Sequence, residues 1–228
     1  MSKAALWPAA VVAALAVVAA PADGARGTAL TGSVDVTCSI DPCRGAGWTC
    51  DGPVALDSVT VNVDTPKDPD GRPINGVALN AGCTGTIGVL VVRTVSSDGL
   101  RISDGARDVA VLAGSVTCSG RDGTVHQDGI QVGGGTRVSL YGLVVSCPTA
   151  NNAQLFVDGK RPKPMDVVCF GCEFRPDPTH IHSVTIGNSL RSGAVDSLVC
   201  PGSSPSWVFH DTHATQPVNL RNVFPPSC

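Results

Sequence analysis

Short apolar strands separated by turns make up most of this chain. The segment Asp57–Val63 alternates apolar and polar residues with a period of two, which is typical of a strand with one buried face. Thr65–Pro73 is rich in Pro and Gly and is predicted to be a loop. Further strands open at recurring but unevenly spaced apolar positions, which are Leu100, Ile130, Leu155, Val184 and Val208. A second apolar segment follows each opening, at 109–118, 138–147, 166–174, 194–200 and 218–224.

One stretch of this pattern occurs twice. Asp98-Gly-Leu-Arg-Ile102 returns as Asp128-Gly-Ile-Gln-Val132, and Cys118 returns as Cys147 at nearly the same offset. Repeats of roughly 20 to 50 residues with short strands are typical of a solenoid. We therefore predict an all-β fold, a single-stranded right-handed parallel β-helix. An antiparallel sandwich or barrel is the alternative, but it gives no reason for the matched cysteines.

The N-terminus predicts export from the cell. One charged residue, Lys3, precedes an apolar run over residues 9–20. A membrane span needs about 20 residues, so this shorter run fits a secretion signal better. We predict a signal peptide over residues 1–22, one domain over residues 23–228, and a secreted, extracellular protein that is monomeric. The net charge of −3 gives no reason to expect nucleic acid as a partner.

The cysteines support the same compartment. All ten follow the predicted signal, and an even number in an exported chain favours disulfide bonds: Cys38, Cys43, Cys50, Cys83, Cys118, Cys147, Cys169, Cys172, Cys200 and Cys228. We expect two of the first three to fasten an N-terminal cap within residues 37–51. Cys118 should lie near Cys147 or near the next pair, and Cys200 should bond Cys228. A redox or zinc pair at Cys169 and Cys172 is the alternative.

Stacking the strand openings places polar residues in columns, because neighbouring strands lie about 4.8 Å apart. Two positions before the opening stand Asp98, Asp128, Ala153, His182 and Ser206. Four positions before it stand Ser96, His126, Asn151, His180 and Ser204. One position after it, pointing outward, stand Arg101, Gln131, Phe156, Thr185 and Phe209.

These columns contain candidate catalytic and binding residues. Two adjacent carboxylates, Asp98 and Asp128, favour a division into acid and base, and His126 is a candidate general base. The same carboxylates are candidate Ca²⁺ ligands, although the sequence contains no certain metal site. The candidate substrate-binding residues are Gln131, Arg101, Asn151, His180 and His182. The alternatives are structural: Asp before Gly often forms a turn, and stacked Asn residues stabilise solenoids without further function.

The repeat pattern and the segment His126-Gln-Asp-Gly-Ile-Gln131 resemble the right-handed parallel β-helix proteins of the pectate-lyase-like superfamily. The resemblance covers roughly residues 57–228. It implies a carbohydrate-active protein that acts on a polysaccharide or cell-wall glycan, as a polysaccharide lyase or glycoside hydrolase. In the lyases of that superfamily, acidic residues hold Ca²⁺ and a basic residue abstracts a proton, but no lyase motif is present here. A non-catalytic exported module, structural or glycan-binding, is the competing hypothesis.

Overall fold

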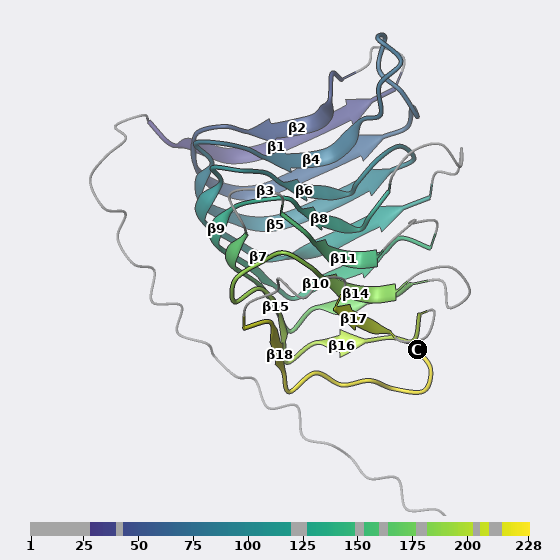
Figure 1. Cartoon of the computed structure of the whole chain (residues 1–228). Coiled ribbons are helices and arrows are strands. Elements are labelled where there is room, and N and C mark those ends of the chain that lie inside the picture. The colour runs from purple at the N-terminus through teal and green to yellow at the C-terminus, as the bar shows by residue number, and fades with distance from the viewer. Residues whose placement is uncertain are drawn as a thin grey trace, which may run out of the picture.

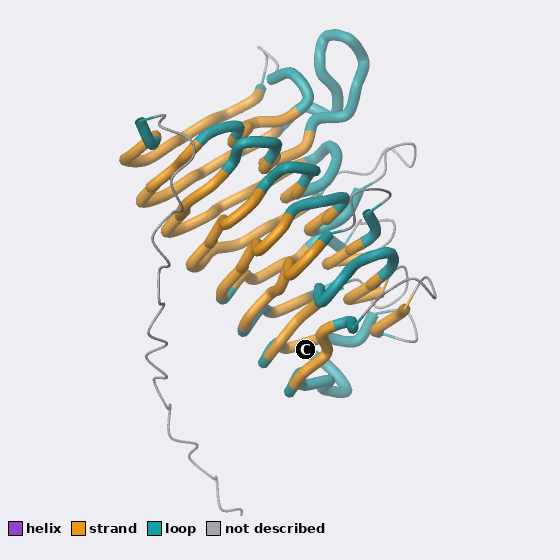
Figure 2. The backbone as a smooth tube through the Cα atoms, turned by 60° about the vertical axis from the view of Figure 1, so that its left-hand side comes forward, coloured by secondary structure: helices purple, strands orange, loops and turns teal. Residues whose placement is uncertain are grey.

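The computed structural model describes residues 28–39, 43–119, 127–148, 153–159, 164–176, 182–202, 206–209 and 216–228. Every regular element in these ranges is a β-strand, and the strands stack in successive turns along one axis (Figures 1 and 2). No helix in the described ranges has the length and apolar character needed to cross a membrane. The predicted signal peptide lies outside the described residues.

Two parallel sheets form the walls of the solenoid. The seven-stranded sheet contains β2 (Ala46–Cys50), β4 (Asn75–Leu79), β6 (Leu100–Ile102), β8 (Ile130–Val132), β11 (Ala153–Val157), β14 (His182–Ile186) and β17 (Trp207–Phe209). The eleven-stranded sheet contains one continuous row of paired strands: β1 (Leu30–Cys38), β3 (Pro53–Val63), β5 (Thr84–Thr94), β7 (Arg107–Cys118), β9 (Thr136–Tyr141), β12 (Met165–Phe170), β15 (Gly193–Val195) and β18 (Val218–Leu220). Its other three strands lie outside this row: β10 (Leu143–Ser146), β13 (Glu173–Phe174) and β16 (Leu198–Val199). The predicted all-β solenoid of parallel sheets is therefore confirmed.

The predicted stacking register holds for most of the seven-stranded sheet. Leu100 pairs with Ile130, Ile130 with Leu155, and Leu155 with Val184. The last predicted opening is wrong by one residue, because Val184 pairs with Trp207 and not with Val208. Residues 207–209 are all apolar, so alternation alone does not determine which of them points inward.

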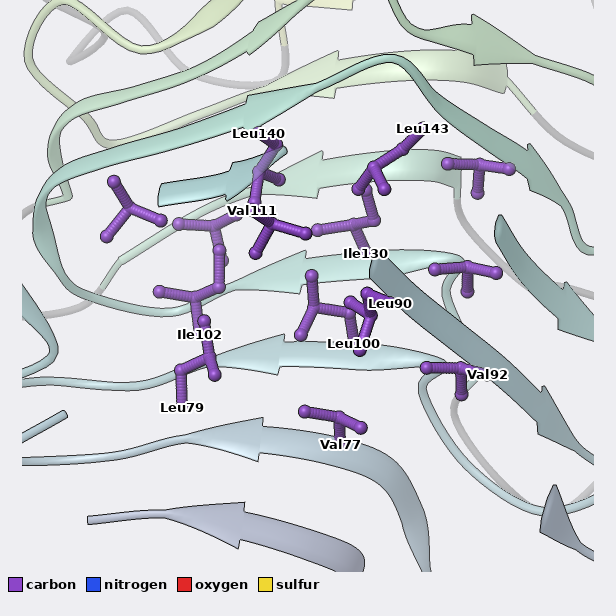
Figure 3. Packing of buried hydrophobic residues seen from close by; sticks show 14 of the residues in the cluster. Val77, Leu79, Leu90, Val92, Leu100, Ile102, Val111, Ile130, Leu140 and Leu143 are labelled. Atoms are coloured by element: carbon purple, nitrogen blue, oxygen red, sulfur yellow. The ribbon is translucent and has the colours of Figure 1, made fainter. Parts of the chain in front are cut away.

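The core is the narrow space between the two sheets. The apolar residues that alternate along these strands point inward and are at most 2% exposed: Leu100, Ile102, Val109, Val111, Ile130, Val132, Val138, Leu140, Leu155 and Val184. Figure 3 shows side chains from successive turns, including Leu100 and Ile130, in contact along the solenoid axis. Burial of these aliphatic side chains is the main stabilising contribution, worth about 1.5–3 kcal/mol for each.

A column of glycines lets the sheets approach closely. Gly76, Gly99 and Gly129 occupy one position in successive turns, directly before the inward residues Val77, Leu100 and Ile130. A Cβ atom added to these glycines would lie 2.2, 2.1 and 2.4 Å, respectively, from a valine methyl group of the opposite sheet. Real Cβ atoms do not make contacts under 3.0 Å. Only glycine therefore fits at these positions without displacing the other sheet.

The structure contains five disulfide bonds. Three join residues 28 to 33 positions apart, which are Cys50–Cys83, Cys118–Cys147 and Cys200–Cys228. Two are local, Cys38–Cys43 and Cys169–Cys172. The predicted bonds in the N-terminal region, between Cys118 and Cys147, and at the C-terminus are confirmed. The predicted cap region also supplies β2 and the end of β1, so the solenoid begins earlier than the sequence indicated. Five disulfides are typical of an oxidising, extracellular environment.

Candidate functional site

The two candidate catalytic aspartates lie side by side, but inside the solenoid. Asp98 and Asp128 are only 1% and 0% exposed. The Oδ1 atom of Asp98 accepts the backbone N–H of Asp128 at 3.0 Å, and the Oδ1 atom of Asp128 accepts the backbone N–H of Ala153 at 3.0 Å. Each carboxylate therefore binds the backbone of the next turn. A catalytic role would require these carboxylates at a solvent-accessible edge, and neither of them reaches one.

Other polar side chains are buried at the same bend, which precedes the strands of the seven-stranded sheet, and they also bind backbone. The Ser96 hydroxyl accepts the N–H of Ile74 at 2.8 Å and donates to the carbonyl of Pro66, which ties the Thr65–Pro73 loop to the solenoid. Gln127 donates to the carbonyl of Ser96 at 2.9 Å. These contacts replace the hydrogen bonds to water that the polar side chains at this bend lost on folding. The presence of buried polar residues here therefore has a structural explanation.

The remaining members of the predicted columns are only partly placed. His182 begins β14, is half-buried and pairs with Ala153. His126, Asn151 and His180 lie outside the described residues. The gathering of histidines around Asp128 therefore stays a prediction.

The backbone occupies part of each buried carboxylate. One oxygen of Asp98 and one of Asp128 each accept a backbone N–H, which leaves only the second oxygen of each for a cation. Among the described residues, no group of three or more His, Cys, Asp or Glu side chains is arranged to hold a metal ion.

The outer face of the seven-stranded sheet contains the column predicted to point outward, with two of the candidate substrate-binding residues, Arg101 and Gln131. Arg101, Gln131, Phe156 and Thr185 pair in register on β6, β8, β11 and β14, so successive side chains are about 4.8 Å apart. Arg101 is exposed, Gln131 and Phe156 are half-buried, and Thr185 is buried. Within the described part of the chain, Arg101 makes no ion pair. We call Arg101, Gln131 and Phe156 the outer column.

A hollow of about 330 Å³ lies where the strands of this sheet end. Its polar lining comes from Asp104 in the bend after β6, from Arg107 at the start of β7, and from Thr136 and Arg137 at the start of β9. We call it the corner hollow. Asp104 and Thr136 were not predicted as functional residues from the sequence. Both residues follow a copy of the repeated strand opening, and this shared position is the sequence signal that could have identified them.

Beside the corner hollow, oppositely charged residues stack along the axis. Arg137 binds Asp108 through two hydrogen bonds of 2.6 and 2.8 Å, and Arg191 binds Asp166 through two of 2.6 and 2.7 Å. All four residues have φ angles between 47° and 56°, an uncommon conformation for residues other than glycine. Hydrogen bonds from the guanidinium group, supported by its charge and opposed by burial, lower the pKa of both Asp108 and Asp166.

An aromatic pair on the other sheet was also missed. The rings of Tyr141 and Phe170 stack at a centroid distance of 5.1 Å and an angle of 16°. These residues pair in register on β9 and β12, one repeat apart, so the repeat itself was the signal. Because the faces point at each other along the axis, the rings present their edges outward. A sugar ring stacks on an aromatic face, so this pair is better explained as a stabilising contact between turns.

Comparisons with protein-family models, with curated proteins and with solved structures found no match to this chain. The class of protein is therefore defined by the fold alone, and it is a disulfide-bonded parallel β-solenoid.

Proposed function

We propose that this protein is an extracellular β-solenoid, akin to the pectate-lyase-like superfamily, that binds a polysaccharide on the outer face of its seven-stranded sheet. The observation that carries the proposal is the outer column. It places a guanidinium group, a carboxamide and an aromatic ring on three adjacent strands. Guanidinium and amide groups bind pairs of hydroxyls through paired hydrogen bonds, and aromatic rings pack on the apolar face of a sugar.

The availability of Arg101 supports this proposal. An exposed arginine that makes no ion pair with a described residue retains its five N–H donors for a ligand. The parallel sheet holds its backbone through pairing with both neighbouring strands, so a ligand meets a preorganised surface. A polymer lying along the solenoid axis meets one side chain of the column per turn.

The burial of Asp98 and Asp128 favours binding over catalysis. Glycoside hydrolysis requires two carboxyl groups that reach the scissile bond, and neither of these reaches solvent. Their hydrogen bonds to the next turn account for the repeated Asp-Gly motif without invoking a substrate.

A binding assay with matched variants tests the proposal. The disulfide-bonded protein is titrated with a panel of neutral and acidic polysaccharides, with reducing ends followed in parallel. Arg101→Ala and Gln131→Ala should each weaken binding by about tenfold, because each removes hydrogen bonds to the ligand. Arg93→Ala is the control: Arg93 is an exposed arginine on β5 in the other sheet, and it too makes no ion pair with a described residue.

The proposal fails if no polysaccharide binds, or if Arg93→Ala weakens binding as much as Arg101→Ala does. Release of reducing ends that disappears in Asp128→Asn would instead restore the catalytic hypothesis.

A further inference from the structure

We infer that the corner hollow is a subsite for one neutral sugar residue of the glycan that lies on the outer column. This inference rests on the proposed function and adds a second site and a ligand class to it. Three properties of the hollow lead to it: its position, its hydrogen-bonding groups and its charge balance.

The corner hollow lies beside the outer column. Arg101 lies on β6, and Asp104 lies in the bend that follows this strand in the same turn of the solenoid. A sugar residue that leaves the outer column past the end of β6 therefore comes to the hollow. The volume of about 330 Å³ is at the lower end of the range for ligand sites, so the hollow has room for one sugar residue.

The lining offers both donors and acceptors. Arg137 uses Nε and one Nη2 hydrogen on Asp108, which fixes its guanidinium group and leaves three N–H donors. Arg107 makes no ion pair with a described residue. The Thr136 hydroxyl both donates and accepts, and the exposed Asp104 carboxylate accepts. Sugar hydroxyls also donate and accept, so they match this set, whereas an anion uses only the donors.

The charges around the hollow cancel. Arg107 and Arg137 carry two positive charges, and Asp104 and Asp108 carry two negative charges. The pKa of Asp108 is lowered by the hydrogen bonds from Arg137, so this residue stays ionised at neutral pH. An acidic sugar would therefore meet repulsion from Asp104 with no net positive charge to offset it, while a neutral sugar meets none.

Two substitutions distinguish a neutral sugar from an anion. The intact protein and its variants are titrated with short and long oligosaccharides of the best neutral glycan in the panel, and with oligogalacturonates. Arg107→Ala should weaken binding of the long neutral oligosaccharides by about tenfold and leave the short ones unchanged. Asp104→Asn should weaken the same complex several-fold, because a neutral amide accepts a weaker hydrogen bond than a carboxylate. Arg93→Ala is again the control.

The results separate this inference from the proposed function. If Arg101→Ala weakens binding while neither Arg107→Ala nor Asp104→Asn does, the subsite is refuted and the outer column stands. If Asp104→Asn tightens binding of oligogalacturonates and leaves neutral ligands unchanged, the hollow is an anion site and the inference is wrong. Absence of binding by any oligosaccharide refutes both.

Discussion

Replacing Gly99 with alanine places a methyl group where the two sheets leave no room for one. The new Cβ atom would lie 2.1 Å from Cγ1 of Val116 and 2.8 Å from the carbonyl oxygen of Gly129. Val116 is fully buried, and its neighbour Cys118 is held by a disulfide to Cys147, so the valine has little freedom to move. Overpacking of this kind costs about 1–3 kcal/mol, which exceeds the ~0.4–1 kcal/mol gained from a less flexible unfolded chain.

Denaturant unfolding of the disulfide-bonded protein measures this effect. Gly99→Ala should lower the free energy of unfolding by about 1–3 kcal/mol. Gly52→Ala is the matched control, because a Cβ atom there meets nothing within 4 Å; it should change stability by no more than about 0.5 kcal/mol. In the double variant Gly99→Ala/Val116→Ala, the new methyl occupies the space that the valine vacates. The double variant should therefore be more stable than the sum of the single effects predicts, by at least about 0.5 kcal/mol. Strict additivity would refute the close-packed glycine column.

Three further predictions follow from the cross-turn contacts. Replacing both Cys118 and Cys147 with serine should cost about 3–4 kcal/mol, because their disulfide closes a 29-residue loop; an unchanged unfolding midpoint would contradict this. The pKa of Asp166 is lowered by the hydrogen bonds from Arg191, so its stabilising contribution is present above about pH 4 and is lost as pH falls through the lowered pKa. The difference in melting temperature between wild type and Asp166→Asn should therefore shrink below about pH 4, and a constant difference would count against the ion pair. Asp128→Asn should keep glycan binding and lose about 1 kcal/mol of stability, since the amide oxygen still accepts the N–H of Ala153; lost binding would show that Asp128 has a functional role.

The sequence was most informative where apolar and polar residues alternate strictly. Leu100 and Ile130 open nearly identical segments, and their pairing follows from the repeat. The alternation weakens at both ends of the chain. Residues 207–209 are uniformly apolar, and the Gly- and Cys-rich residues 37–51 obscured the first turn, although the alternating residues 33–38 indicate a strand.

The candidate site could be predicted only in part, because a sequence column does not reveal which way a corner residue points. Asp98 and Asp128 precede glycines at a bend between sheets, where the backbone leaves the regular alternation of a strand. Their side chains point inward to bind the next turn, whereas Arg101 lies within a strand and obeys alternation. The outer column was therefore predictable, and the burial of the aspartates was not.

Mapping the bound glycan onto the protein by NMR tests the central claim most directly. The backbone amides of the labelled, disulfide-bonded protein are followed during titration with the polysaccharide fragment that binds best. The account predicts that the largest chemical-shift changes fall on β6, β8 and β11, around Arg101, Gln131 and Phe156. Changes centred on the eleven-stranded sheet, or on the buried corner around Asp128, would contradict it.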